Sequence, residues 1–348
     1  MADRKQRPSR ITATPRQKAW IARLRPELQR YFPDDVRHLD LRVAEPPDLR
    51  ANVRMFSFTV LADGLPTADI LVKATHGRQA TDLDMAFRAA QVLEQRFATE
   101  PHLNTPRMLD LWKEPRALIM EKVEGESLSV RMKDCRNWAI ETGCQLAQHF
   151  VEQAGRWLAL LHEMPAPAWS QPMPDPLTGM ESLLTRLRTF GVDPLEEKRI
   201  RELIGVLGGN SRHEELPLHG DYGIHNILCR SPHDITVLNA MLAWQGPAAR
   251  DIGEFMATVR CIDKWHLFGG EMAYTSAVIR QTEQKFLAGY KSVRPVPQKA
   301  HIRAYAGLRL LEYWLDHVQH QQTRNIAGLR SLIIRRINQH FVHAILND

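Results

Sequence analysis

The sequence of 348 residues contains no run of about 18 consecutive apolar residues, the length that a membrane-spanning helix needs. Its N-terminal stretch, MADRKQRPSRITATPRQKAW, has basic residues but no apolar segment behind them, so we expect no secretory signal. The cysteines show neither the paired spacing of a zinc site nor that of a redox motif; they are Cys135, Cys144, Cys229 and Cys261. These absences predict a reduced, cytoplasmic protein.

The composition excludes the disordered and fibrous classes of protein. Hydrophobic residues make up 44% of the chain and charged residues 25%, as in ordinary globular proteins. No internal repeat or low-complexity segment stands out. The length suffices for one large or two medium domains.

The positive net charge of +6 is concentrated at the N-terminus. Residues 1–30 contain nine Lys and Arg residues and two acidic ones, so they carry +7 and the remaining chain carries −1. A basic arm of this kind can contact nucleic acid or anionic lipid. It has no clustered aromatics and no nucleic-acid-binding module, so we expect no nucleic-acid partner and at most a weak contact with a membrane surface. The simplest interpretation is a solvated tail that leads into a helix.

Hydrophobic periodicity divides the chain into a strand-rich and a helix-rich part. Apolar residues recur every four positions over 14–32, which predicts an amphipathic helix. Residues 53–75 predict two strands around a turn at Asp63–Gly64, and 104–128 predict two more around Glu114–Pro115, with a helix over 81–98 between them. From residue 248 onward the chain predicts successive helices, the last over 326–345. We therefore predict an α+β fold with two lobes and a ligand-binding cleft at their junction.

Four segments, in this order, carry a resemblance to a known family. They are ILVKA at 70–74, ALIMEKVEGESL at 117–128, WLALLHEM at 157–164, and LHGDYGIHNIL with TVLNA and DIGEF at 218–255. Together they resemble the aminoglycoside and choline phosphotransferase family, and the resemblance covers most of residues 50–260. It implies a fold similar to that of protein kinases, with a small β-sheet N-lobe and a larger, mostly helical C-lobe. The expected domains are a basic arm and helix at 1–32, the N-lobe at 33–124 and the C-lobe at 125–348.

The resemblance also implies an activity. Members of the family transfer the γ-phosphate of ATP to a hydroxyl of a small molecule, with Mg²⁺ as the metal. A sugar, an aminosugar or an amino alcohol is the expected acceptor here, and the sequence carries no signal for an oligomeric state. Phosphoryl transfer asks a protein mainly for positioning and charge neutralisation. Asp221 stands where the family keeps the catalytic aspartate that meets the acceptor hydroxyl, and Asn226 stands where it keeps a magnesium ligand.

The nucleotide side of the site is expected in the strand-rich part. Lys73 matches the family lysine that reaches the α- and β-phosphates, and an ammonium group on a rigid strand suits that role. Glu121, Lys122 and Val123 match the segment that receives adenine through backbone groups. The lysine usually pairs with a glutamate on the next helix, for which Asp84 and Glu94 are the candidates here. In the C-lobe, His162 and Asp251 are expected to brace the catalytic loop.

Asn239 departs from the family pattern. Thirteen residues after Asn226 the family places a second metal-binding aspartate, and this chain has an asparagine there. Mg²⁺ prefers anionic oxygen, and an amide carbonyl supplies a dipole instead of a charge. Two interpretations stay open: a phosphotransferase with weakened activity, or a pseudokinase that binds nucleotide or a partner without turnover. The presence of Asp221, Asn226 and Lys73 favours retained nucleotide binding, and we favour the enzyme.

Overall fold

The computed structural model describes residues 12–35, 37–49, 53–75, 80–134, 141–208, 214–230, 233–261, 276–323 and 330–346. Residues 1–11 of the predicted basic arm, Cys135 and the beginning of the helix predicted from Ile326 lie outside these described residues. The chain divides into two compact units. The sheet unit comprises Met1–Ala98 and Thr105–Glu124, and the helical unit comprises Thr99–Asn104 and Gly125–Asp348.

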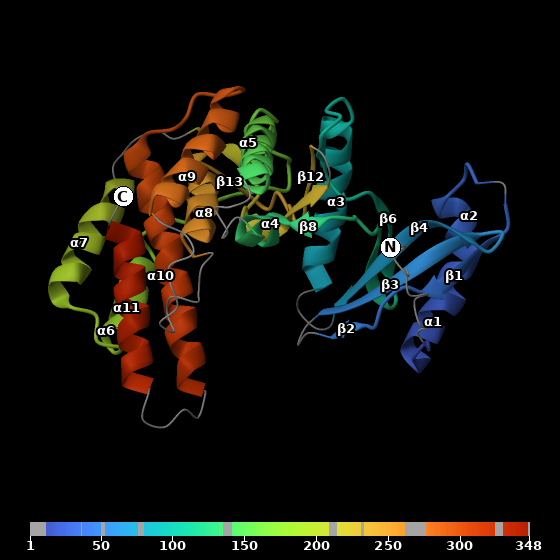
Figure 1. Cartoon of the computed structure of the whole chain (residues 1–348), viewed down its shortest axis with the longest axis horizontal. Coiled ribbons are helices and arrows are strands. Elements are labelled where there is room, and N and C mark those ends of the chain that lie inside the picture. The colour runs from blue at the N-terminus through green and yellow to red at the C-terminus, as the bar shows by residue number, and fades with distance from the viewer. Residues whose placement is uncertain are drawn as a thin grey trace. The chain divides into compact units, whose positions relative to one another are not determined.

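An antiparallel sheet organises the sheet unit (Figure 1). Its strand order is β1-β3-β4-β7-β6, and β2 pairs with β3. The predicted hairpin is confirmed: β3 and β4 flank Asp63 (φ 49°) and Gly64 (φ 82°), which both adopt the left-handed conformation of a tight hairpin turn. The strands are β1 (Leu39–Val43), β2 (Asp48–Leu49), β3 (Val53–Ala62), β4 (Leu65–Thr75), β6 (Met108–Lys113) and β7 (Arg116–Glu121).

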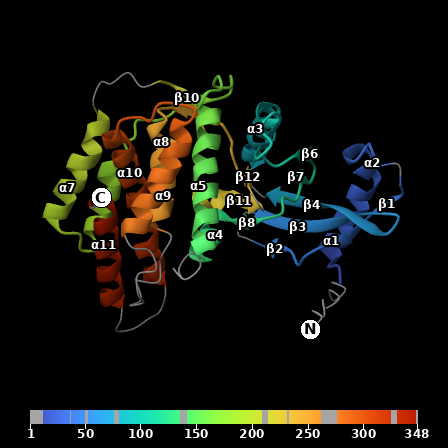
Figure 2. The same ribbon diagram turned by 45° about the horizontal axis from the view of Figure 1, so that its top comes forward.

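One face of this sheet is covered by the N-terminal helices α1 (Pro15–Leu24) and α2 (Leu28–Tyr31), as Figure 2 shows. Trp20 and Leu24 belong to the same buried core as the strand residues Phe58 and Val72. The amphipathic helix predicted over 14–32 is confirmed in outline, since the chain is helical from Pro15 to Tyr31, but it is not one α-helix. The chain instead forms a short 3₁₀ turn at Arg25–Glu27, because Pro26 has no N–H to donate and its ring clashes with an α-helical turn.

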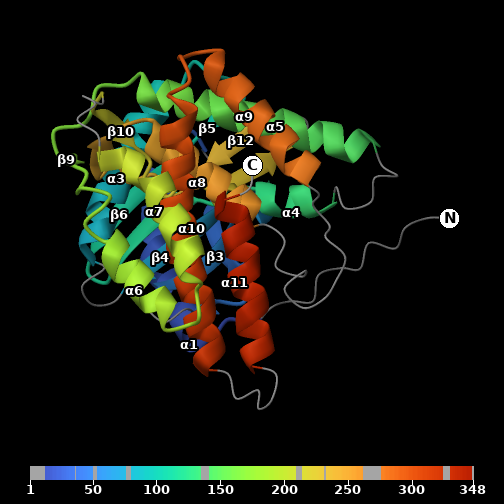
Figure 3. The same ribbon diagram turned by 90° about the vertical axis from the view of Figure 1, so that its left-hand side faces the viewer.

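The helical unit contains eight α-helices among its described residues, and Figure 3 shows α10 and α11 lying side by side. The helices α5 and α9 approach so closely that a Cβ atom at Gly155 would lie 2.0 Å from the backbone oxygen of Phe286. They are α4 (Leu128–Asp134), α5 (Glu141–His162), α6 (Met180–Arg188), α7 (Pro194–Gly205), α8 (Ala249–Arg260), α9 (Ser276–Lys291), α10 (Lys299–Thr323) and α11 (Arg330–Leu346). The predicted helical character of this part is confirmed.

Two small sheets accompany these helices. One has the order β10-β13-β9 and the other β5-β12-β11-β8. Their strands are β5 (Leu103–Asn104), β8 (Glu126–Ser127), β9 (Gln171–Pro172), β10 (Leu216–Leu218), β11 (Ile227–Arg230), β12 (Asp234–Val237) and β13 (Trp244–Gly246). The chain is therefore a mixed α+β protein with an antiparallel N-terminal sheet and a helical C-terminal part, as predicted. Within its described residues, no helix has the length and apolar character needed to cross a membrane.

Candidate active site

The loop from His219 to Gly223, which follows β10, is fixed by a buried carboxylate. Asp251 on α8 is fully buried and accepts the backbone N–H groups of His219 (2.7 Å) and Gly220 (3.1 Å). Burial alone would raise the pKa of Asp251, but the hydrogen bonds from His162 and from the backbone of His219 outweigh it, so this pKa lies below its usual range. The bracing role predicted for Asp251 and His162 is confirmed, and a charged carboxylate holds the loop.

His219 is a second brace, and the sequence argument missed it. Its Nε2 lies 3.0 Å from the carbonyl oxygen of Leu238 and must donate to it, so Nδ1 is free to accept the backbone N–H of Asp221 at 3.2 Å. Burial lowers the pKa of His219, which favours this neutral tautomer. The ring therefore ties the segment before Asn239 to the backbone of Asp221. The position of His219, two residues before Asp221, is the sequence feature that could have indicated this role.

Tyr222 fastens the loop to α5. Its hydroxyl donates to the carbonyl oxygen of Ala154 at 2.7 Å, and its ring stacks on Trp157 at a centroid distance of 5.8 Å. Gly220 has a φ of 84°, in the region that glycine adopts without a steric cost. The neighbouring Asp221 side chain is therefore presented by a backbone that is held on both sides.

Three of the predicted site residues lie together and form one hydrogen-bonded chain. Asn226 donates from Nδ2 to the Asp221 carbonyl (2.9 Å) and to Asp221 Oδ2 (2.8 Å). Asn239 in turn donates from its Nδ2 to Asn226 Oδ1 at 2.9 Å. Asn226 is buried, whereas Asn239 is exposed and has a φ of 62°, a left-handed conformation that asparagine tolerates. An aspartate at position 239 would place a second oxygen against Asn226 Oδ1, an arrangement that a bound cation would stabilise.

The Asp221 carboxylate is ionised and reachable. Burial favours its neutral form, but the neighbouring His225 (3.7 Å) and the hydrogen bond from Asn226 outweigh burial and hold the pKa of Asp221 below its ordinary value. Its side chain is 45% exposed. A charged, accessible carboxylate can accept a hydrogen bond from a hydroxyl group and orient it.

Arg309 on α10 adds a cation that the sequence did not predict. Its guanidinium lies 3.4 Å from Asp221 Oδ1, 2.8 Å from Glu254 Oε1 and 2.5 Å from Glu312 Oε2. It also lies over the ring of Tyr313, with 4.5 Å between the guanidinium carbon and the ring centroid. Glu254 is only 2% exposed, and burial raises its pKa to about 7 even though Arg309 and Arg250 oppose the shift.

The raised pKa of Glu254 has a consequence for stability. The folded state binds the proton more tightly than the unfolded chain, whose pKa is near 4.5, so Glu254 favours folding most below pH 4.5 and loses this effect as pH rises to 7. Wild type should lose stability between about pH 5 and about pH 8 as Glu254 ionises, whereas Glu254→Gln has no proton to lose. The unfolding free energy of the variant minus that of wild type should therefore rise by about 3 kcal/mol over this pH range. Urea unfolding at both pH values measures the difference.

The exposed Glu202 on α7 provides the matched control, and Glu202→Gln should follow the wild type at both pH values. If Glu254→Gln also follows the wild type, Glu254 titrates at its ordinary value and the argument from burial is wrong.

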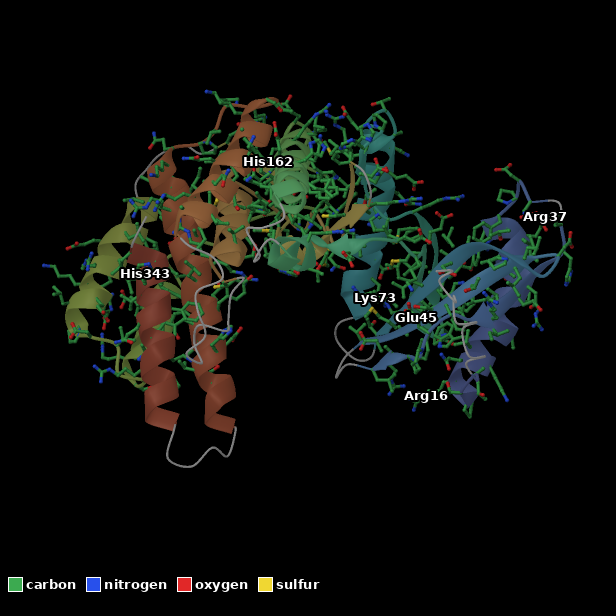
Figure 4. All side chains as sticks on the ribbon, in the orientation of Figure 1. Arg16, Arg37, Glu45, Lys73, His162 and His343 are labelled. Atoms are coloured by element: carbon green, nitrogen blue, oxygen red, sulfur yellow. The ribbon has the colours of Figure 1, made fainter. Side chains whose placement is uncertain are left out.

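In the sheet unit, Lys73 lies on the central strand β4, paired with Leu118 of β7 and Met55 of β3 (Figure 4). Side chains alternate along a strand, so Lys73 points away from the face on which Val72 packs into the core. Of the two acids considered as its partner, Asp84 forms an ion pair with Arg116 and Glu94 is exposed. Residues 76–79, which follow β4, lie outside the described part of the chain.

The segment 121–123 follows the end of β7. The backbone N–H of Glu121 donates to Arg107 (3.0 Å) and that of Lys122 to Asp69 (2.8 Å). Within the described residues, the N–H of Val123 donates to no backbone carbonyl. The Lys122 side chain bonds to Glu45 at 2.5 Å, and both lie in the sheet unit. Backbone groups, rather than these side chains, are what the segment can offer a ligand.

The side chains that could bind a divalent metal carry little negative charge. Among the residues described, no group of three or more His, Cys, Asp or Glu side chains is placed to hold a metal ion. Asn226 and Asn239 do bring two amide groups together beside the Asp221 carboxylate. Amide oxygens are hard donors that suit Mg²⁺, and a half-turn of the Asn239 amide would direct its oxygen instead of its nitrogen to the shared position. The residues therefore fit a weakly held magnesium ion.

The fold is that of kinase-like phosphotransferases. Glucosamine kinase in complex with glucosamine, ADP and inorganic phosphate superposes with a TM-score of 0.56 at 15% identity, over 86% of this chain and 80% of that one. Spectinomycin phosphotransferase in complex with ADP and spectinomycin gives 0.55 at 12% identity, over 88% and 92%. A choline/ethanolamine kinase family protein from Mesorhizobium loti gives 0.50 at 10%, over 94% and 99%.

The family follows from the sequence match. The phosphotransferase enzyme family model matches residues 49–238, more than half of the chain, and this protein belongs to that family. A search of curated proteins finds no match.

Proposed function

We propose that this protein is an ATP-dependent phosphotransferase that moves the γ-phosphoryl group to a hydroxyl of a small molecule. The observation that carries the proposal is the ionised, accessible Asp221, held by Asn226 and joined through it to Asn239. Family membership supports the reaction class. The ADP bound to glucosamine kinase and to spectinomycin phosphotransferase supports ATP as the donor. A sugar, an aminosugar or an amino alcohol remains the expected acceptor.

Asp221 would orient the acceptor hydroxyl and receive its proton. The hydroxyl oxygen forms a bond to the γ-phosphorus, the bond from that phosphorus to the bridging oxygen breaks, and ADP leaves. A carboxylate with a lowered pKa is a weak base, but the loose transition state of phosphoryl transfer needs orientation more than early proton removal. The bonds to Asp221 from Asn226 and Arg309 fix its position before the acceptor arrives.

Asn226 and Asn239 would hold Mg²⁺ through their side-chain oxygens, and the ion would neutralise charge on the phosphates. In the sheet unit, Lys73 would contact the phosphates as a point charge. The backbone at 121–123 would receive adenine, for which the N–H of Val123 is the natural donor.

Replacing Lys73 with alanine tests the nucleotide part of the proposal. The variant loses a phosphate contact, and a charged hydrogen bond contributes about 1.5–3 kcal/mol, so we expect ATP affinity to fall by roughly 10- to 100-fold. The rise in melting temperature on adding ATP should then largely disappear. Lys113, at the end of β6, is exposed, and Lys113→Ala is the matched control. An unchanged thermal shift in Lys73→Ala would mean that Lys73 is not at the phosphates.

The second candidate function is a pseudokinase that binds nucleotide without turnover, and the amide at position 239 is the observation that favours it. An assay of ADP release by purified protein with ATP, Mg²⁺ and pooled sugars, aminoglycosides and amino alcohols distinguishes the enzyme from the pseudokinase. Magnesium- and acceptor-dependent ADP release supports the enzyme. A thermal shift with ATP but no ADP release supports the pseudokinase.

A further inference from the structure

A pocket of about 290 Å³ lies beside the catalytic loop within the helical unit. Gly220, the residue before Asp221, is part of its wall, and so is Leu308, the residue before Arg309. The pocket therefore borders the backbone that carries Asp221 and the helix turn that carries Arg309, although neither of these two side chains lines it. The volume lies at the lower end of the range for ligand pockets and suits a molecule the size of a monosaccharide.

The wall of the pocket is mixed, with apolar leucine, methionine and proline side chains beside charged ones. Trp244 lies on this wall and is 38% exposed. An exposed indole ring beside a small cavity offers a flat surface for the C–H face of a sugar ring. The shape and lining therefore favour a small hydroxylated ring over an extended chain.

Three ionisable side chains line the pocket, and two of them are already engaged. Glu312 pairs with Arg309 at 2.5 Å. Asp175 is exposed and accepts the backbone N–H of Leu177 at 2.9 Å. The third is Arg250, at the start of α8, and no carboxylate of the described residues lies within ion-pair distance of its guanidinium.

Two acids follow Arg250 on α8, and both are engaged elsewhere. Asp251 accepts the backbone N–H groups of His219 and Gly220. Glu254 lies one turn further on α8, and its Oε1 is 2.8 Å from Arg309. The charge of Arg250 acts on the buried Glu254 without forming an ion pair with it. A guanidinium on the wall of a cavity, with five donors, is suited to bidentate binding of a carboxylate or a phosphate.

We infer that Arg250 selects an acceptor that carries an anionic group, either a carboxylate or a phosphate ester, in addition to the hydroxyl that is phosphorylated. This inference rests on the proposed function and narrows its acceptor class to a small anionic sugar. Arg250 binds the anion, Trp244 covers the ring, and the hydroxyl at the other end reaches Asp221 past Gly220. The phosphoryl-transfer step is the one proposed above: the acceptor hydroxyl attacks the γ-phosphorus, ADP leaves, and the hydroxyl proton passes to Asp221 and then to solvent.

The test is a panel of acceptors of matched size: glucuronate, a glucose phosphate ester, glucose and glucosamine. In wild type, one of the two anionic acceptors should give the highest kcat/KM, and which of the two it is identifies the anion. In Arg250→Ala, kcat/KM for that acceptor should fall by about 10- to 100-fold, mainly through KM, since a charged hydrogen bond is lost. The low kcat/KM for glucose and the KM for ATP should stay as they are.

Arg199 on α7 is exposed and does not line the pocket, so Arg199→Ala is the matched charge control and should behave as wild type. A preference for glucose or glucosamine that is unaffected in Arg250→Ala would overturn the inference and leave the proposed function standing.

A binding measurement separates the inference from turnover. If no acceptor is phosphorylated, but glucuronate or the phosphate ester raises the melting temperature of wild type and not of Arg250→Ala, the anion site stands and the proposed function fails. If neither anion shifts the melting temperature of wild type and no acceptor is phosphorylated, both are wrong.

Discussion

The Asp221→Ala variant is expected to lose about 10²- to 10⁴-fold in kcat, the usual effect of removing a positioned acid–base group. The reason is the hydrogen-bonded frame around this residue. Asn226 and Arg309 both bond to the carboxylate, and His219 holds its backbone, so the carboxylate is fixed where a hydroxyl can meet it. Initial rates of ADP release at saturating ATP and acceptor measure the effect.

The same variant should bind ATP nearly as well as wild type, because Asp221 serves the acceptor and not the nucleotide. An ATP thermal shift measured beside the kinetics verifies this. Asp316 on α10 is exposed, and Asp316→Ala controls for the loss of one surface charge. Full turnover in Asp221→Ala would remove the basis of the phosphotransferase assignment.

The Asn239→Asp variant is expected to turn over about 10²-fold faster than wild type, if the remaining site is intact. The substitution adds an anionic metal ligand at nearly unchanged size, and one restored charge-stabilising contact in the transition state contributes a few kcal/mol. Half-saturation should also move to a lower Mg²⁺ concentration. Without metal the variant should lose about 1 kcal/mol of stability, because the N–H bond to Asn226 Oδ1 is replaced by two facing oxygens.

Asn239→Ala is the matched control, since it removes the same hydrogen bond without adding a charge. It should bind metal no better than wild type. If Asn239→Asp tightens nucleotide binding without raising turnover, the protein is a pseudokinase whose loss lies elsewhere. If neither quantity changes, Asn239 does not contact the metal.

Local pattern was enough to predict the β3–β4 hairpin and the strands β6 and β7, but it did not predict β1 or β2. The alternation of apolar residues over 53–75, with Asp-Gly between the two halves, determined both strands and the turn, since Phe58 pairs with Ile70 across it. Over 14–32 the same kind of pattern predicted the helical segment but not its division into two α-helices. There the apolar residues kept a helical spacing across Pro26, but a proline in the interior of an α-helix removes a hydrogen bond and clashes with the preceding turn, and the chain forms a 3₁₀ turn instead.

The candidate site likewise has one part that could be predicted from the sequence and one part that could not. Asp221, Asn226 and Asn239 lie within one short stretch of chain folded around the β11–β12 pair, so sequence spacing could bring them together. Arg309 is 88 residues from Asp221 and meets it only because α10 packs on α8. The buried Glu254 and the cation at Arg250 acquire their properties from that packing, which no local pattern encodes.

We propose that the helical unit carries a working phosphoryl-transfer site that is weakened at Asn239. The most direct test of this proposal is transfer of a radiolabelled γ-phosphoryl group from ATP to a small molecule separated from the protein, measured for wild type, Asp221→Ala and Asn239→Asp in parallel. We predict magnesium-dependent label on the small molecule with wild type, a nearly complete loss with Asp221→Ala and a large increase with Asn239→Asp. Nucleotide binding by all three proteins with no label on any small molecule would contradict the proposal.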